Sequence, residues 1–377
     1  MPANKKHHYV PRFYLKRFSI NGRSIQLFNI RATRVVANAN LKGQCYRDYM
    51  YGKELDLEFN LAQLEGAFAD LTRKVIEWVA LPPPLSEDHE NLAIFVVLQY
   101  ARTAYSADAL DEFADGMWKR VLSHHRDVTP QMLEKVRIVY TEPGRAAVGY
   151  FLRLYHLIMD MHCRLLLAPA GGEFVTSDNP VILYNQLMES ERFGGSTGLA
   201  SKGLQIILPL SPTHALLMFD HGVYAVEPKN KRIVQLSSKE DLAQINLLQV
   251  ASAQENVYFS NHAAADIYRV VERGKRFRRK LKTKITVFPQ ERTGAGESEL
   301  IANSREQLRT GLALSFVRVI KPAKRWRDER NKQRLKPATV IRNLEYFRVH
   351  ERFLSLVDSG HYQPTEFLRY LRESDAC

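Results

Sequence analysis

The spacing of apolar residues predicts a long amphipathic helix between residues 56 and 79. Large apolar side chains recur there at steps of three or four residues, which places them on one face of an α-helix. These positions are Leu57, Leu61, Leu64, Phe68, Leu71, Val75 and Trp78. Three consecutive prolines at 82–84 end the pattern, because proline has no amide hydrogen to donate and clashes with the preceding turn.

A second helix is predicted for residues 88–109, and it is apolar on almost every side. Ser86 can cap its start, and acidic residues follow near the positive end of the helix dipole. Residues 92–98 are all apolar, and a helix without a polar face lies in the centre of a protein. The polar exceptions are Gln99, Arg102 and Thr103.

Strands follow the helices along the chain. Helical patterns continue over residues 110–126, 129–140, 146–167 and 239–253. Short apolar runs bounded by turn residues predict strands at 24–30, 181–184, 204–208, 214–220, 223–226 and 257–260. These elements predict an α+β fold, in which a helical N-terminal half packs on a mainly antiparallel sheet and a basic C-terminal extension follows.

The net charge of +13 is concentrated in two short runs near the C-terminus. Residues 273–284 contain eight basic residues and no acid, and residues 321–336 contain eight more against two acids. These runs together exceed the net charge of the whole chain, so the remainder is close to neutral. Concentrated positive charge attracts polyanions. We therefore divide the chain into a core domain, residues 1–272, and a basic C-terminal region, residues 273–377.

The overall composition is that of an ordinary globular protein, with 45% apolar and 25% charged residues. No apolar run reaches the roughly 18–20 residues of a membrane helix, and no apolar segment follows the charged start as in a secretory signal. Cys45, Cys163 and Cys377 are far apart, which argues against a disulfide framework and against a cysteine zinc site. We expect a cytoplasmic location and no membrane partner.

A polar stretch at residues 174–181 interrupts two apolar runs. Asp and Asn side chains bond to nearby backbone groups and Pro180 ends a strand ladder, so one interpretation is a tight turn between core strands. The other is a polar loop on a rigid scaffold that presents Thr176, Ser177, Asp178 and Asn179 to a cleft. Ser177 is a weak nucleophile candidate, because no Gly-x-Ser-x-Gly turn surrounds it.

The histidine-rich N-terminal segment, residues 7–18, is predicted to pack onto the body, because frayed ends are usually small and polar. His7 or His8, with Asp178 and either Glu58 or Glu65, suggests a metal site of imidazole and carboxylate ligands, or a general base with an orienting carboxylate. A divalent metal suits such ligands, and the sequence does not identify one. The alternative is that His8 and Tyr9 anchor the segment through hydrogen bonds.

Gln99 and Arg102 are candidates for ligand binding. An arginine in an apolar helix is costly unless it is paired, either with a carboxylate such as Asp178 or with a phosphate ligand. A structural Arg102–Asp178 ion pair is therefore the alternative to ligand binding.

Four segments together resemble the bacterial family known as domain of unknown function 4238. They are His7-His8-Tyr9-Val10-Pro11-x-Phe13-Tyr14-Leu15-x-x-Phe18, Gln99-x-x-Arg102-Thr103, Thr176-Ser177-Asp178-Asn179-Pro180-Val181 and Pro209-Leu210-Ser211-Pro212. The resemblance covers roughly residues 7–262 and leaves the basic C-terminal region outside. It implies no activity, fold or cofactor.

Aromatic side chains lie within the basic runs. Basic groups bind phosphates without reading sequence, and aromatic rings stack on unpaired bases. The predicted nucleic-acid contacts are Arg276, Arg278, Arg279, Lys280, Lys324, Arg325, Trp326 and Arg327. The alternative is a solvated tail, or a face that binds an acidic protein.

The leading hypothesis is a nucleic-acid-interacting protein, with a nuclease of a bacterial defence or toxin type as its catalytic form. A non-catalytic binding or adaptor module, and a small-molecule or nucleotide hydrolase, are the alternatives. Catalysis requires the candidate residues to meet in one pocket open to water. Those residues are His8, Gln99, Arg102, Ser177 and Asp178.

Overall fold

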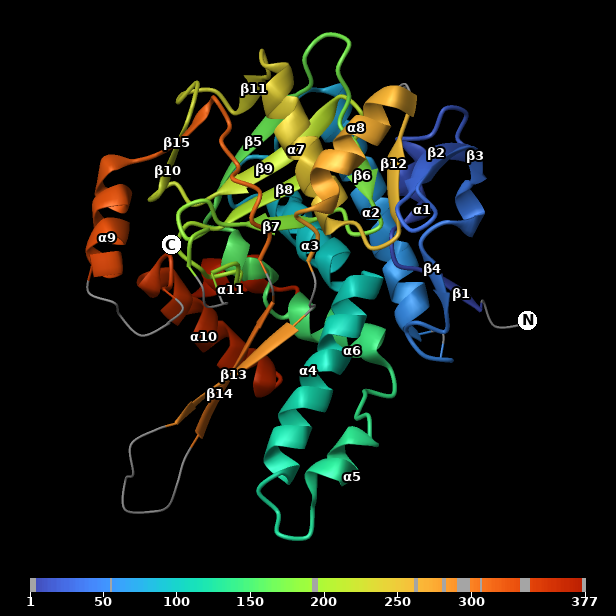
Figure 1. Ribbon diagram of the computed structural model, residues 1–377. Coiled ribbons are helices and arrows are strands. Elements are labelled where there is room, and N and C mark those ends of the chain that lie inside the picture. Colours follow the sequence, from blue (N-terminus) through green and yellow to red (C-terminus); the bar gives the residue numbers. More distant parts are fainter. Residues whose placement is uncertain are drawn as a thin grey trace.

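A five-stranded sheet lies at the centre of the computed structural model (Figure 1). The structure describes residues 5–54, 56–191, 196–260, 264–279, 283–289, 299–305, 307–332 and 340–374. The strand order is β11-β5-β9-β8-β7, antiparallel throughout except for the parallel pair β11–β5. These strands are β5 (His162–Leu167), β7 (Ile182–Tyr184), β8 (Gln205–Pro209), β9 (His214–Phe219) and β11 (Ile233–Gln235). The predicted strands at 181–184, 204–208 and 214–220 are confirmed.

Both faces of this sheet are buried. Leu165, Ile206 and Leu216 point into one hydrophobic cluster, and their neighbours Leu166 and Ile207 point into a second. Each fully buried aliphatic side chain of this kind stabilises the fold by roughly 1.5–3 kcal/mol. Burial on both faces explains why these strands are continuous apolar runs instead of alternating ones.

Helices cover the first face of the sheet. They are α2 (Asp56–Glu77), α3 (Glu87–Ala101) and α6 (Pro143–Leu152), with the short 3-10 turn η2 (Tyr155–Ile158). Helix α4 (Ala104–Leu122) follows α3 and projects away from the sheet together with α5 (Pro130–Glu134), in which no residue is buried (Figure 1). Residues 92–98 of α3 are all buried, which confirms that α3 is a central helix. The predicted helix over 88–109 is wrong at its end, because the Thr103 side chain accepts a hydrogen bond from the Ser106 amide and starts α4.

The predicted helix over 146–167 is also wrong in its second half. Helix α6 ends at Leu152, and residues 162–167 form strand β5, which pairs with β9 along its whole length. A short apolar run buried on both faces has the same appearance in a helix and in a strand, so periodicity alone does not separate them. Residues 162–167 form a strand because they pair with β9. The helix predicted to reach residue 140 ends at Glu134.

A second sheet lies beside the first, in the order β3-β2-β12-β6 with all pairs antiparallel. Its strands are β2 (Ser24–Asn29), β3 (Arg34–Asn40), β6 (Thr176–Ser177) and β12 (Asn256–Phe259). Near it are α1 (Arg12–Lys16), η1 (Leu41–Gly43) and the strand pair β1 (Lys6–His8) and β4 (Tyr46–Asp48). Helices α7 (Lys239–Ser252) and α8 (Ala264–Lys275) lie side by side over these strands and the central sheet (Figure 1).

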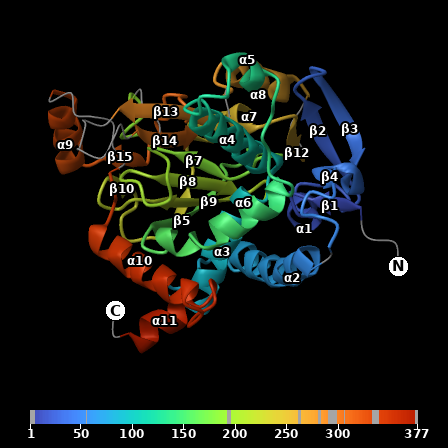
Figure 2. The same ribbon diagram turned by 90° about the horizontal axis from the view of Figure 1, so that it is seen from below.

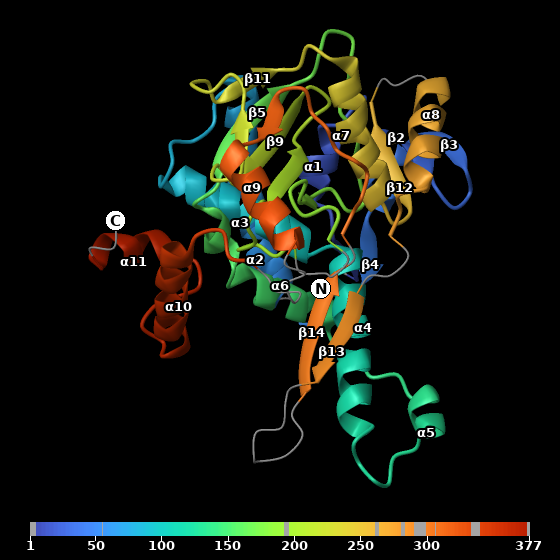
Figure 3. The same ribbon diagram turned by 60° about the vertical axis from the view of Figure 1, so that its left-hand side comes forward.

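The C-terminal region packs against the same hydrophobic clusters as the rest of the chain. Its elements are β13 (Thr283–Pro289), β14 (Glu299–Arg305), β15 (Val317–Val319), α9 (Lys321–Lys332), α10 (Leu344–Asp358) and α11 (Phe367–Glu373). Strand β15 pairs with β10 (Tyr224–Val226), and the β13–β14 hairpin lies along α4 (Figure 3). Phe353 and Phe367 join the cluster that contains α3, and Figure 2 shows α10 and α11 beside that helical layer. Leu308 and Leu314 join the cluster beneath α7.

The fold is therefore mixed α+β with mainly antiparallel sheets, as the sequence predicts. The N-terminal half is not purely helical, since β1, β2, β3 and β4 precede α2. The division at residue 272 stays a prediction, although residues from both sides of it share two hydrophobic clusters. Among the helices that the structure describes, none combines the length and the apolar character needed to cross a bilayer.

Candidate functional site

The N-terminal segment forms an edge strand that is held by hydrogen bonds. Strand β1 pairs antiparallel with β4, and the Tyr9 amide donates to the Cys45 carbonyl at 2.8 Å. His7 is buried and stacks on the Tyr51 ring, with 5.5 Å between ring centroids. Its Nδ1 accepts a hydrogen bond from the Tyr51 amide at 3.2 Å. The predicted docking of this segment onto the body is confirmed.

His8 is half-buried and faces the backbone of η1. Its Nδ1 lies 3.0 Å from the Gln44 carbonyl oxygen, so this nitrogen carries the proton. Burial lowers the pKa of His8, although the Gln44 carbonyl opposes that shift. His8 is therefore held in one tautomer as a neutral ring.

The Arg102 side chain fixes the end of strand β1 in place. The residue is 3% exposed; its Nη1 donates to the Glu65 carboxylate and its Nη2 to the His8 carbonyl, each at 2.7 Å. Burial alone would lower the pKa of Arg102, but Tyr51 and Glu65 outweigh it, and the pKa is raised. The Arg102–Asp178 ion pair, given above as the alternative to ligand binding, is absent from the described structure, because the partner of Arg102 is Glu65.

Gln99 supports the next residue of the same segment. Its amide nitrogen donates to the Tyr9 carbonyl at 3.3 Å, one turn of α3 away from Arg102. The Gln99 and Arg102 side chains thus bind two consecutive backbone carbonyls of the N-terminal segment. Gln99 and Arg102, two of the three polar exceptions named above, thus have a structural function here.

Carboxylates from α2 complete this cluster. Glu65 pairs with Arg102, and burial raises the pKa of Glu58, with His7 and Arg102 opposing the shift. No group of three or more His, Cys, Asp or Glu side chains suited to a metal ion occurs in the part of the chain that the structure describes. The spacing of Glu58 and Glu65 on one helical face was visible in the sequence, whereas Tyr51 carried no signal.

Asp178 belongs to a different network. It is 2% exposed, and its carboxylate accepts hydrogen bonds from the backbone amides of Gln254, Glu255 and Asn256 at 2.7, 2.6 and 3.0 Å. Burial raises the pKa of Asp178 to about 6, against the effect of these three amides. The side chain closes the turn between α7 and β12, which is a structural function.

Ser177 and Asn179 bind helix α7. The Ser177 hydroxyl donates to the Gln249 side chain at 2.9 Å, and the Asn179 amide donates to the Ser252 hydroxyl at 2.8 Å. The predicted tight turn is thus present, but it is buried, and its polar groups bind the protein itself. Ser177 has no exposed surface.

The Tyr14 hydroxyl joins three of the sequence motifs. It lies 2.7 Å from the Thr176 hydroxyl and donates to the Pro209 carbonyl at 2.6 Å. Tyr14 comes from the N-terminal motif, Thr176 from the Ser-Asp-Asn-Pro motif and Pro209 from the Pro-Leu-Ser-Pro motif. Since the side chain is fully buried, this contact connects α1 to both sheets.

The candidate residues therefore fall into two groups. The structure brings His8, Gln99 and Arg102 together, and it places Ser177 and Asp178 in a separate buried turn. The expectation of a single pocket open to water is wrong for these residues, because four of the five are buried. A catalytic function for them stays a prediction without geometric support.

The first basic run lies against the body of the protein. Arg278 donates to the carbonyls of Ala253 and Gln254, and the Arg279 guanidinium lies 5.0 Å from the Tyr105 ring. Arg276 is exposed and stacks on the neighbouring Phe277 ring. Lys280 lies outside the described residues. The Arg278 and Arg279 side chains thus already contact groups of the protein itself, which leaves fewer of their N–H groups for a nucleic acid.

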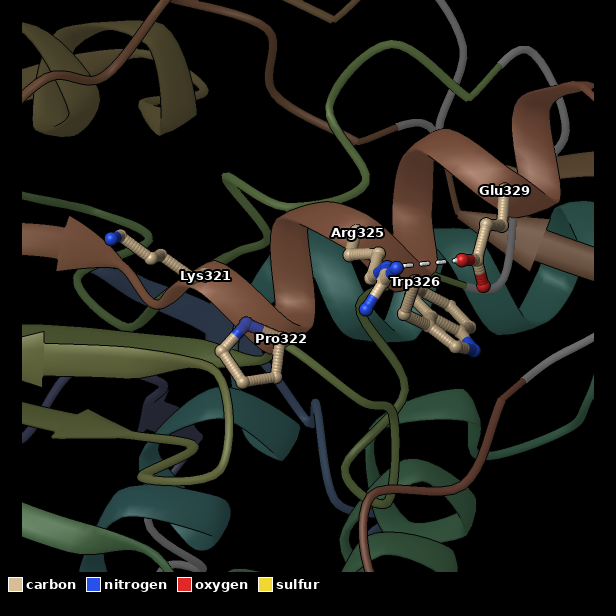
Figure 4. A pocket seen from close by; sticks show the side chains of 5 residues that line it. All are labelled: Lys321, Pro322, Arg325, Trp326 and Glu329. Carbon is tan, nitrogen blue, oxygen red and sulfur yellow. Dashed lines mark ion pairs between the residues drawn. The ribbon is translucent and has the colours of Figure 1, made fainter.

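The second basic run forms helix α9. Lys324 and Arg325 are exposed, Trp326 is half-buried and Arg327 pairs with Asp328. Figure 4 shows Arg325 and Trp326 beside a surface hollow of about 440 Å³, which Lys321, Pro322 and Glu329 also line. Arg325 Nε lies 3.5 Å from the Glu329 carboxylate, at the exposed surface. Such surface pairs contribute little, so Arg325 stays available to a ligand.

A second hollow was not predicted. Residues 159–164 and 229–232 are among those that line it. The sequence prediction had a helix over 146–167, so it missed strand β5, whose first residues lie in the wall of this hollow. The pair of neighbouring basic residues at Lys231 and Arg232 was the available sequence signal.

The family comparison agrees with the motifs. Residues 6–263 match the family described as "Protein of unknown function (DUF4238)". No curated protein and no solved structure matches the chain. The matched residues contain Tyr14, the Ser-Asp-Asn-Pro turn and the Gln99–Arg102 pair, and they end before the first basic run.

Proposed function

The chain belongs to the DUF4238 family, whose description assigns no activity, and we propose from its structure that it binds single-stranded nucleic acid through helix α9. One observation carries this function. Helix α9 presents exposed basic side chains and a half-buried tryptophan on one surface, beside a hollow (Figure 4). Basic groups bind phosphates and an indole stacks on an unpaired base.

The anchoring of α9 supports this function. Ala323 is buried in the cluster beneath α7, and Arg330 pairs with Glu191 at 3.4 Å. The Trp326 ring packs against that cluster and lies 5.5 Å from the Lys202 ammonium group. A rigidly held aromatic ring loses little conformational freedom when a base stacks on it.

The proposal is limited to nucleic-acid binding and does not include cleavage. Asp178, the candidate metal ligand or orienting carboxylate, and Ser177, the weak nucleophile candidate, each bind backbone or side-chain groups of the protein and have almost no exposed surface. Neither lies on α9. The experiment below therefore measures binding first and follows the integrity of the labelled strand in the same samples.

The test compares the full-length chain with a triple variant, Lys321→Ala, Lys324→Ala and Arg325→Ala. We expect the affinity for a short labelled single-stranded RNA or DNA to fall at least about tenfold at physiological salt. The salt dependence of log K should fall by about 2, since each lost phosphate contact removes about 0.7. Fluorescence anisotropy over a salt series measures both quantities.

The matched control removes the same charge from another surface. Arg31, Arg34 and Lys42 are exposed near strand β3, and their triple alanine variant should keep the affinity and most of the salt slope. Equal losses in both triple variants would refute a site on α9 and would indicate general electrostatic attraction. Tight binding to an acidic protein with no binding to either nucleic acid would refute the proposal itself. Trp326→Ala should weaken binding with little change in salt slope.

A further inference from the structure

A second hollow, of about 460 Å³, lies at the N-terminal end of strand β5. Three segments and Tyr346 of α10 form its wall, and the segments are residues 84–89 before and in α3, residues 159–164 at the start of β5, and residues 229–232 before β11. Two of these segments are tied together, because the Arg232 guanidinium donates to the carbonyls of Leu81 and Pro82 at 3.1 and 2.8 Å. The volume lies within the usual range of small-molecule pockets, roughly 300–1,000 Å³.

Positive charge dominates this hollow. Arg164, Lys229, Lys231 and Arg232 all line it. Asp160 is the one carboxylate among the lining residues, and both of its oxygens accept hydrogen bonds from Arg342, Oδ1 at 2.6 Å and Oδ2 at 3.0 Å. The carboxylate is thus neutralised by a residue outside the hollow. A concave surface with unbalanced positive charge concentrates anions.

Arg164 is the buried member of this group. It is 8% exposed; its Nη1 and Nη2 donate to the carbonyls of Cys163 and Lys229, each at 3.1 Å. Its Nε has no hydrogen-bond partner among the described residues. The guanidinium lies over the Phe219 ring at 5.3 Å, and no carboxylate pairs with it in the described part of the chain. A buried cation without a counter-charge is costly, and an anionic ligand would supply that charge.

The histidines around the hollow experience the same positive field. His162 stacks on His221 with 4.2 Å between ring centroids. Burial first, and then His221, Arg164 and Arg232, lower the pKa of His162. Burial and then Arg232 lower the pKa of His89 to about 4.

The remaining wall is apolar or aromatic. It contains Pro84, Leu85, Met159, Met161 and Tyr346, beside the His162 ring. Met159 and Met161 are almost completely buried in the core cluster, so the accessible surface comes from Leu85, Tyr346 and the flat His162 ring that stacks on His221. The hollow therefore combines a cationic end with a surface suited to an uncharged ring.

We propose that this hollow binds a phosphate monoester of about nucleotide size, with the phosphate at Arg164, Lys229 and Lys231 and the organic group against Leu85, Tyr346 and the His162 ring. Arginine and lysine are the usual phosphate-binding residues, and Arg164 already lies in the wall. The site is built from different residues than α9, so it is independent of the proposed nucleic-acid binding.

Calorimetric titration of the full-length protein tests the site with three probes: AMP, inorganic phosphate and adenosine. We expect AMP to bind more tightly than inorganic phosphate, and adenosine to show no measurable binding. The double variant Lys229→Ala and Lys231→Ala should weaken AMP binding at least about tenfold. Both lysines are exposed in a loop, so the variant is expected to keep its fold, which circular dichroism checks.

The matched control is Lys321→Ala with Lys324→Ala, two exposed lysines of α9. It should keep the AMP affinity and lose RNA affinity, while the Lys229/Lys231 variant should show the reverse. An unchanged AMP affinity in the Lys229/Lys231 variant would overturn the proposal. So would adenosine binding as tightly as AMP, AMP binding no tighter than inorganic phosphate, or equal losses of AMP affinity in both double variants. None of these results depends on the behaviour of α9 toward nucleic acid.

Discussion

At the scale of single residues, the polar motifs of this chain connect its elements to one another. The Tyr14 hydroxyl binds Thr176 and Pro209, and Gln99 and Arg102 bind consecutive backbone carbonyls of the N-terminal segment. A buried polar group stabilises a fold only when its hydrogen bonds are made, so each of these groups requires its partners. The motifs that look catalytic in the sequence therefore have a measurable structural function.

Replacing Tyr14 with phenylalanine tests the hydrogen bonds by which the Tyr14 hydroxyl connects three of the sequence motifs. The variant keeps the ring and leaves the buried Thr176 hydroxyl and Pro209 carbonyl without this partner. We expect the free energy of unfolding to fall by about 1–3 kcal/mol, measured by urea denaturation. Tyr150→Phe is the control, because Tyr150 is exposed. Equal stabilities of the two variants would contradict this structural function.

Replacing Asp178 with asparagine tests the buried turn. The carboxylate accepts three backbone hydrogen bonds, and an amide replaces one acceptor oxygen by a donor that faces N–H groups. We expect a loss of about 3 kcal/mol in the free energy of unfolding, with a lower thermal midpoint. A variant of unchanged stability would return Asp178 to the list of functional candidates.

At the scale of elements, the C-terminal helices complete the core. Helices α10 and α11 bury Phe353, Phe367 and Leu371 in the cluster that contains α3. Arg342, just before α10, pairs with Asp160, and both side chains are largely buried. The basic C-terminal region is therefore more than a charged tail attached to a finished domain.

Removing residues 340–377 tests this dependence. The truncation exposes the apolar side chains of α3 and η2 that these helices cover, so we expect the thermal midpoint to fall by at least about 10 °C. Binding of a hydrophobic fluorescent dye should increase at the same time. Removal of residues 375–377 alone is the control and should change neither quantity. A truncated protein as stable as the full chain would show that the core is complete without these helices.

At the scale of the whole molecule, the stability depends on buried neutral histidines. His156 and His350 form a buried hydrogen-bonded pair between η2 and α10. Burial lowers the pKa of His350 to about 4, and burial together with His350 lowers the pKa of His156. In the unfolded chain both rings titrate near 6.5.

This pair predicts a loss of stability in acid. Between pH 6.5 and about 4 the unfolded chain binds protons that the folded pair cannot accept, so the free energy of unfolding falls as the pH falls. In a His350→Gln variant we expect the free energy of unfolding to fall less steeply with decreasing pH. Its total decrease over this pH range should be smaller than in the unmodified protein by on the order of 2 kcal/mol. Urea titrations of both proteins at several pH values measure the difference. The raised pKa of Asp178 acts in the opposite direction, but it is common to both proteins and cancels. Equal slopes in the two proteins would contradict a neutral buried pair.

Much of the element content was predictable from local patterns. The helix at 56–77, the central helix α3 and the strands β7, β8 and β9 follow from apolar spacing, because periodicity records which face is buried. The split between α3 and α4 was missed, because Ala and Tyr residues on both sides of the Thr103 cap continue the helical pattern. Strand β5 was missed because its pairing with β9 is non-local.

The sequence by itself determined the α+β class, the central position of α3, the family membership and the two basic runs. Each of these depends on composition or short-range spacing, which the chain carries without folding. Only the tertiary structure decided that Arg102 pairs with Glu65, that Asp178 binds backbone amides and that Arg164 lies in a cationic hollow. The partner of a polar side chain depends on which distant segments the fold brings within hydrogen-bond distance, and no local pattern contains that information.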